Sequence, residues 1–196
     1  MKTDTKTRIL EEGTKRVYEK GFYATGLQEI LAGAGVPKGS FYFYFKSKED
    51  FGLQLIDENA RRHLDRVDRY LKDPSKTPLQ RLSDYFHDLM SAFEKNGFKG
   101  GCPFGNLSLE MGDRNERFRI RLEEVFKALK LKIAACLEEA RRQGEVAADL
   151  DVQEASDFIL SSFQGTLLQM KVSKTTTHQR FFERIVFEKL LKGSVG

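Results

Sequence analysis

The sequence predicts an all-α fold of about nine helices, in which a small domain of three short helices precedes a larger helical domain. Apolar residues recur mostly at spacings of three and four, which is the period of an α-helix. No segment shows the regular alternation of apolar and polar residues that indicates a strand. The chain has 196 residues but only four prolines, so helices can be long and the prolines mark their boundaries.

Three short helices are expected first, over about residues 4–20, 27–34 and 38–44. An apolar stripe that includes Ile9 and Val17 predicts the first of them. Gly21 and Gly35 end the first and the second, because glycine readily adopts the conformation that closes a helix. Together these helices predict an N-terminal domain over residues 1–47.

Six further helices are expected, over about residues 48–71, 79–94, 103–111, 115–142, 152–172 and 178–192. Ser47 is interpreted as the N-cap of the first, and the acidic residues Glu49 and Asp50 in its first turn suit the helix dipole. This helix would connect the N-terminal domain to a second domain, which we assign to residues 48–196.

The composition is that of a folded globular protein, with 40% hydrophobic and 32% charged residues. A net charge of +4 permits a polyanionic partner but does not require one. No apolar run approaches the roughly 20 residues that span a bilayer. Residues 1–8 are polar and charged, unlike a signal peptide, so we expect a cytoplasmic protein that does not bind membranes.

Catalytic and metal-binding motifs are not recognisable in the sequence. It contains no Ser-His-Asp motif, no phosphate-binding loop and no cluster of metal ligands. The two cysteines, Cys102 and Cys136, are too few for a disulfide framework, and the three histidines lie far apart. We therefore expect no enzyme, no cofactor and no metal site, and we interpret the cysteines first as ordinary thiols.

Residues 25–48 have the pattern of a helix-turn-helix. Leu27 and Ile30 place apolar side chains on one face of the first helix, and the small Ala34 lets two helices cross closely. Gly35 lies where the chain must turn sharply. Any helical hairpin with a glycine turn shares this pattern, so the second helix has to be considered as well.

The second helix of this motif has two different sides. Phe41 and Phe45 are four residues apart and are expected to pack inward, while Lys38, Tyr42 and Phe43 face outward at about 100° per residue. A cation, a phenol and a large ring form a plausible surface for a DNA groove, and a helix N-terminus favours phosphate. The alternative is that the aromatic run is core and nothing more.

Residues 21–49 carry a set of residue types in a fixed order and spacing: Gly21-Phe22, Thr25, Ile30, Ala34-Gly35-Val36, Lys38-Gly39-Ser40-Phe41-Tyr42, Tyr44-Phe45 and Ser47-Lys48-Glu49. In order and spacing this set resembles the N-terminal signature of the TetR family of transcriptional regulators. The resemblance implies a DNA-binding domain of three helices, a connecting fourth helix and an all-helical C-terminal domain.

The resemblance also implies a function. The chain would be a ligand-responsive regulator, most often a repressor, that binds a palindromic double-stranded DNA operator as a homodimer and is released by a small molecule. By their place in the signature, the implied DNA-binding residues are Thr25, Lys38, Gly39, Ser40, Tyr42, Phe43, Tyr44 and Lys48. Phe43 often matches a polar residue in the family, so here it would contact a thymine methyl group or a sugar instead.

The C-terminal domain would hold the dimer interface and the effector pocket. The expected interface lies on the last two helices, with Gly165 permitting close approach, and includes Phe158, Leu167, Phe181, Phe182 and Ile185. The candidate pocket residues are Phe86, Met90, Phe93, Cys102, Phe104, Asn106, Met111, Phe126, Phe163 and Gln164. In both sets the alternative is that the apolar side chains are simply core.

Two other functions stay open at this point. Cys102 lies in a glycine-rich joint and could be an exposed thiol that senses electrophiles or oxidants. The chain could also be a helical adaptor that kept the fold and lost DNA binding, since Phe43 and the modest positive charge leave room for that.

Overall fold

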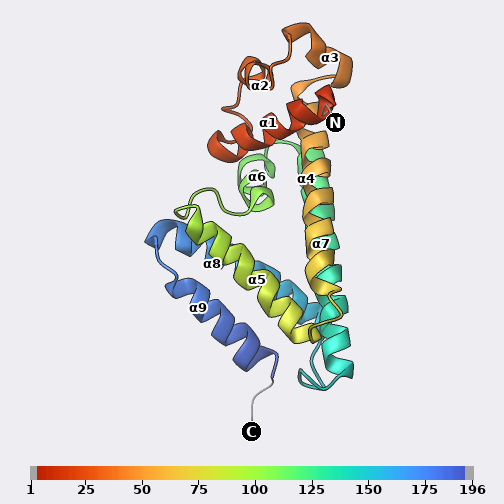
Figure 1. Cartoon of the computed structure of the whole chain (residues 1–196), viewed down its shortest axis with the longest axis vertical. Helices are drawn as coiled ribbons and strands as arrows, with labels where there is room; N and C mark the ends of the chain where they lie inside the picture. Colours follow the sequence, from red (N-terminus) through yellow and green to blue (C-terminus); the bar gives the residue numbers. More distant parts are fainter. Residues whose placement is uncertain (1–3, 193–196) are drawn as a thin grey trace. The chain divides into compact units, whose positions relative to one another are not determined.

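The computed structural model of the chain describes residues 4–192, and all regular structure within that range is helical (Figure 1). The elements in chain order are α1 (Thr5–Lys20), α2 (Leu27–Gly33), the 3-10 turn η1 (Lys38–Ser40), α3 (Phe41–Tyr44), α4 (Lys48–Leu71), α5 (Pro78–Lys95), α6 (Pro103–Met111), α7 (Glu116–Arg142), α8 (Val152–Ser173), α9 (Thr177–Glu183) and the π-helical segment η2 (Arg184–Leu190). The all-α fold predicted from the sequence is confirmed.

Two elements differ from the expected helices. The helix expected over 38–44 begins as a 3-10 turn, in which the Ser40 N–H donates to the Pro37 carbonyl at 3.0 Å. The last helix, expected to run to residue 192, loosens into η2 after Glu183. The carbonyl of Leu191, the residue after η2, accepts the N–H of Ala147, so a tertiary contact holds this end of the segment.

Residues group by contact into two compact units. One combines the chain up to His63 with Pro103–Val125, and the other combines Leu64–Cys102 with the chain from Phe126 onward. This grouping places α6 in the same unit as α1, α2 and α3. It is a different division from the functional one expected at residues 47 and 48, which stays a prediction.

The core of the first unit is aromatic. Phe41, Phe45 and Phe51 form a cluster with ring centroids 5.1 to 5.9 Å apart, and each ring is at most 1% exposed. The Phe22 ring lies 4.9 Å from that of Phe118 on α7. Since aromatic pairs at such distances add to the stabilisation from area burial, these rings fix the short helices that have little stability of their own.

The core of the second unit joins α5, α8 and α9. The Phe86 ring lies 5.1 Å from that of Phe163 and 5.4 Å from that of Phe182, and all three are buried. α8 and α9 pack against one another. No described helix is both long and apolar enough to cross a membrane.

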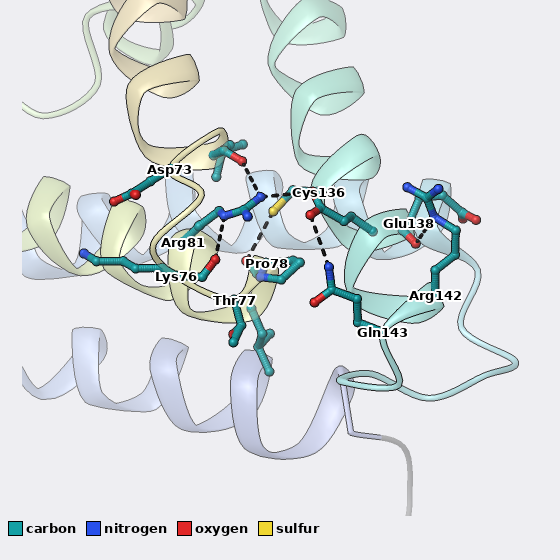
Figure 2. Close-up of polar contacts among 12 residues, drawn as sticks. Asp73, Lys76, Thr77, Pro78, Arg81, Cys136, Glu138, Arg142 and Gln143 are labelled. Atoms are coloured by element: carbon teal, nitrogen blue, oxygen red, sulfur yellow. Dashed lines mark hydrogen bonds and ion pairs between the residues drawn. The ribbon is translucent and has the colours of Figure 1, made fainter.

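A buried guanidinium holds the start of α5 (Figure 2). Arg81 is 9% exposed and donates to the carbonyls of Leu71 at 3.2 Å and Lys76 at 2.9 Å, and to the Glu139 carboxylate at 3.0 Å. One side chain therefore connects the end of α4, the following linker and α7. Thr77 adds a capping box at the N-terminus of α5.

Candidate DNA-binding surface

The segment 38–45 separates its aromatic side chains as predicted. Phe41 and Phe45 are each 1% exposed and belong to the core of the first unit. Tyr42 is 66% exposed and Phe43 is 82% exposed. The local fold therefore presents a phenol and a phenyl ring on the outer side of α3, which is anchored through its other side.

The remaining residues predicted for this surface lie around the two exposed rings. Lys38 and Gly39 are exposed, and Ser40 is half-buried. The Tyr44 ring is also half-buried and lies 5.0 Å from that of Phe43 in an edge-on arrangement. Gly35 has φ of 62°, the left-handed conformation expected for the turn of the motif. The turn therefore places the start of η1 at the surface.

Thr25 is buried in the turn between α1 and α2. Its side chain is 0% exposed, and its hydroxyl donates to the Gly21 carbonyl at 2.6 Å. The carbonyl at the end of α1 needs a partner, and the Thr25 hydroxyl supplies one inside the turn. The Thr25 side chain is therefore used inside the turn, and a DNA contact by Thr25 stays a prediction.

Lys48, the first residue of α4, is half-buried against the turn between α1 and α2. Its Nζ donates to the Tyr23 carbonyl at 3.1 Å and lies 5.0 Å from the centroid of the Phe22 ring. Burial lowers the pKa of Lys48 from its ordinary value, and the charge of Glu110 opposes that lowering. The cation predicted to contact phosphate is therefore held in place by this turn.

Ser47 is the N-cap of α4, as predicted. Its hydroxyl accepts the Asp50 N–H at 3.0 Å, and the Asp50 carboxylate accepts the Lys46 N–H at 2.8 Å. These two bonds fix the chain where it passes from α3 to α4. They set the direction in which Lys48 leaves the backbone.

Sequence reasoning missed Glu110. The Glu110 carboxylate accepts the backbone N–H groups of Phe22 at 2.8 Å and Tyr23 at 2.7 Å. The partners are separated by 88 and 87 residues along the chain. No local pattern in the sequence signals such a contact.

The residues predicted for an effector pocket are mostly buried. Phe104, Asn106 and Met111 belong to the first unit and the other predicted residues to the second. In the second unit, Phe86 and Phe163 pack against each other and act as core. Among the predicted residues, the half-buried ones are Cys102, Asn106, Phe126 and Gln164. Their role in a pocket stays a prediction.

The second unit carries an apolar groove of about 270 Å³ on α8, α9 and η2, lined by Phe158, Ser162, Gly165, Thr166, Gln169, His178, Phe181, Phe182, Ile185 and Val186. Three of the residues predicted for a dimer interface are exposed here: Phe158 and Phe181 at 48% each and Ile185 at 40%. Phe182 lines the groove but is 4% exposed. Leu167 is 7% exposed and packs in the core of its own chain, and its assignment to a dimer interface stays a prediction.

Comparison with known proteins agrees with this geometry. A family model described as "Bacterial regulatory proteins, tetR family" matches residues 9–55, and one described as "Tetracyclin repressor-like, C-terminal domain" matches residues 78–186. The chain is similar to the HTH-type transcriptional repressor DhaR of a Mycobacterium species, with 32% identity over 97% of this chain and 94% of that protein.

Two further similarities have comparable extent. The transcriptional regulator AcuR of Cereibacter sphaeroides is 35% identical over 84% of this chain and 75% of that protein. The crystal structure of the reduced form of NemR from Escherichia coli has a TM-score of 0.90 and 25% identity, and the alignment covers 98% of this chain and 100% of that chain.

Proposed function

The chain belongs to the TetR family of bacterial transcriptional regulators, and on that premise we propose that it represses transcription by binding a palindromic DNA operator as a homodimer until a small molecule releases it. It acts by binding, without a catalytic step, and it works in the cytoplasm, where the chromosomal DNA of a bacterium lies.

The observation that carries DNA binding is the exposed pair Tyr42 and Phe43. A phenyl ring that is 82% exposed adds little to the stability of its own chain. In a major groove it would cover a thymine methyl group, and the Tyr42 hydroxyl and Lys38 would reach phosphate oxygens. The buried Phe41 and Phe45 hold this surface rigidly, which base recognition requires.

Fluorescence anisotropy with duplex DNA from the region upstream of the gene tests DNA binding. We expect binding that weakens steeply as salt rises, because phosphate contacts release counterions. Lys48→Ala and Tyr42→Phe should each weaken binding, and Lys48→Ala should reduce the salt slope by about 0.9. Lys127→Ala, the same charge change at an exposed position on α7, is the control. Equal effects of Lys48→Ala and Lys127→Ala would remove the support for this surface.

The apolar groove on α8, α9 and η2 supports the homodimer. Phe158, Phe181 and Ile185 expose large apolar side chains along it, and such a contiguous patch favours a protein partner. A two-fold axis through this surface would bring the same helices of two chains together as a four-helix bundle. Dimerisation would in turn place two copies of α3 in successive major grooves.

In this proposal, a small molecule releases the protein from DNA by shifting the equilibrium from a conformation that binds DNA to one that does not. An effector can weaken operator binding only by as much as it prefers the state that does not bind DNA, so a few kcal/mol of preference suffices. Operator affinity measured across a broad set of small molecules and oxidants tests this step. If none of them changes the affinity, the effector part of the proposal fails while DNA binding stands.

A second trigger is supported by the surroundings of Cys102. This thiol is half-buried, and Lys171 donates to the carbonyl of Gly100, two residues before it, at 3.0 Å. Partial exposure makes the Cys102 thiol more accessible to a small reagent than the buried Cys136. The structure of NemR described as its reduced form belongs to a relative with 25% identity. We therefore propose Cys102 as the site of an electrophile or an oxidant in the alternative mechanism.

Alkylation of the folded protein, followed by peptide mass spectrometry, tests this alternative with Cys136 as an internal control. Burial raises the pKa of the Cys136 thiol to about 12, and its Sγ donates to the Pro78 carbonyl at 3.3 Å. We expect iodoacetamide to modify Cys102 first and Cys136 only after unfolding. A Cys102 that stays unmodified in the folded protein would end the alternative.

A further inference from the structure

The turn between α1 and α2 is bound by a carboxylate from α6. Oε2 of Glu110 accepts the Phe22 N–H at 2.8 Å, and Oε1 accepts the Tyr23 N–H at 2.7 Å. Both bonds join a charged acceptor to backbone donors, and such bonds are stronger than neutral ones. All of these residues belong to the first unit, in which α6 lies beside α1 (Figure 1).

Gly21 makes room for this carboxylate. It has φ of 88°, and a Cβ built at this position would lie 2.9 Å from Oε2 of Glu110. Only a residue without a side chain combines that backbone conformation with so close an approach. The turn is thus shaped to present two successive N–H groups to Glu110.

The same turn holds Lys48. Tyr23 donates its N–H to Glu110 and accepts Lys48 Nζ at its carbonyl, at 3.1 Å. The Phe22 ring, whose backbone N–H also binds Glu110, lies under the Lys48 ammonium at 5.0 Å. A continuous set of contacts therefore runs from the last turn of α6, through Phe22 and Tyr23, to the first residue of α4.

We propose that Glu110 is a positioning residue for DNA binding, which acts through the α1–α2 turn to place Lys48. The proposal rests on the proposed function, since Lys48 is there a phosphate contact. Glu110 itself touches no DNA. It fixes the backbone of Tyr23, and with it the carbonyl that holds the Lys48 side chain.

The direction in which DNA affinity changes when the Glu110 charge is removed distinguishes a positioning role from simple charge repulsion. A carboxylate close to a phosphate-binding cation repels DNA, so deleting its charge would by itself strengthen binding. Loss of the positioning contact has the opposite effect, because the turn and Lys48 then have to be ordered when DNA binds. A weaker complex after removal of a negative charge therefore indicates positioning.

The test compares Glu110→Gln with Glu116→Gln, using anisotropy with duplex DNA from upstream of the gene. Glu116 lies in the first unit on the exposed side of α7, paired with Arg119 at 2.7 Å, so both variants lose one negative charge. Glu110→Gln should bind about tenfold more weakly, with a shallower salt slope, and Glu116→Gln should bind as tightly as wild type or slightly more tightly.

A double-mutant cycle and an amide-exchange measurement locate the effect. If Glu110 acts through Lys48, then Lys48→Ala with Glu110→Gln binds no more weakly than Lys48→Ala alone. By NMR, the Phe22 and Tyr23 amides should exchange faster in Glu110→Gln while the amides of the α4 core keep their protection. This measurement needs no DNA, so it reports on the contact directly.

The outcomes distinguish this inference from the proposed function. Wild-type protein that binds no DNA overturns both. Wild-type binding that Lys48→Ala weakens, together with equal affinities for Glu110→Gln and Glu116→Gln, overturns only the role of Glu110. Additive losses in the cycle, or unchanged exchange of the two amides, overturn the route through the turn.

Discussion

Phe43 exposes 82% of its surface, whereas Phe41, two residues earlier, is 1% exposed. The same side chain therefore has opposite energetic roles at the two positions. Burial of a Phe stabilises a fold by about 1.5–3 kcal/mol, and an exposed Phe gives nothing comparable. At the scale of single residues, stability and recognition are assigned to alternate sides of one short helix.

Alanine at these two positions should separate stability from DNA binding. Phe41→Ala should lower the free energy of unfolding by about 3–5 kcal/mol, because it empties a site between Phe45 and Phe51. Phe43→Ala should change it by less than about 0.5 kcal/mol and should weaken operator binding. Chemical denaturation and anisotropy on both variants check this. A strongly destabilised Phe43→Ala protein would contradict the assignment.

Single residues also mark where prediction from the sequence ends. Helical phase separated Phe41 from Phe43 because the side a residue faces follows from local geometry. The burial of Thr25 and the binding of Glu110 to the α1–α2 turn did not follow, because both depend on contacts that only the folded chain brings together. The family resemblance assigned Thr25 to DNA binding by its position in the sequence. Position alone does not show that the Thr25 hydroxyl donates to the Gly21 carbonyl.

At the scale of elements, helix boundaries are stabilised by specific polar contacts rather than by helix propensity alone. Ser47 and Asp50 close the N-terminus of α4, and Thr77 with Gln80 closes that of α5. Arg81 holds the linker between these two helices. The helices and the Ser47 cap were predicted from the sequence, because they depend on residues a few positions apart, whereas the Thr77 capping box was not. The 3-10 turn η1 and the π-helical segment η2 were not predicted either.

Arg81 is predicted to be the most sensitive of these contacts. Arg81→Leu leaves the carbonyls of Leu71 and Lys76 and the Glu139 carboxylate without this donor, and should lower the free energy of unfolding by about 2–4 kcal/mol. Urea denaturation measures the change. Arg142→Leu, on the exposed side of α7, is the control and should stay within about 0.5 kcal/mol of wild type. Equal effects of the two variants would contradict this role.

Asp50 should make stability depend on pH at the acid end. The Lys46 N–H that it accepts lowers the pKa of Asp50 from its ordinary value, and Gln54 adds to this. A lowered pKa in the folded state gives stability that is present above the ordinary value and lost as the pH falls through the folded value. Asp50→Asn should therefore be about 0.5 kcal/mol less stable at pH 7 and lose less stability between about pH 5 and pH 3.

Urea denaturation across this pH range measures the effect. Asp57→Asn on the same helix, where Asp57 pairs with Arg121 at 3.0 Å, controls for the loss of one carboxylate away from the helix start. An acid limb that is equally steep in wild type and Asp50→Asn would show that this cap does not contribute.

At the scale of the whole molecule, five of the exposed large apolar side chains lie on the two surfaces proposed for DNA binding and for dimerisation. Tyr42 and Phe43 lie on the first unit, and Phe158, Phe181 and Ile185 line the groove on the second. The fold class and the family followed from the sequence, because periodicity and a fixed signature report on both. The interface stays a prediction: Leu167 has the right residue type but lies on the buried side of α8.

A charge placed in the groove on α8, α9 and η2 should prevent two chains from associating. Phe158→Glu places a charge at the groove without removing a core side chain, since Phe158 is 48% exposed. It should leave the helical content unchanged and convert a dimer into the 22.5 kDa monomer, as measured by sedimentation velocity. If the proposed homodimer binds its operator through two linked copies of α3, DNA affinity should fall by about 10²-fold or more even though α3 is untouched.

Leu131→Glu is the matched control, because Leu131 on α7 is 55% exposed and does not line the groove. Gly165→Leu provides a second variant: a Cβ built at Gly165 meets nothing within 4 Å in the single chain, and leucine favours the helix, so folding should not suffer. The larger side chain would nevertheless fill the close approach expected between two copies of α8. A dimer that survives both Phe158→Glu and Gly165→Leu would place the two-fold contact on another surface.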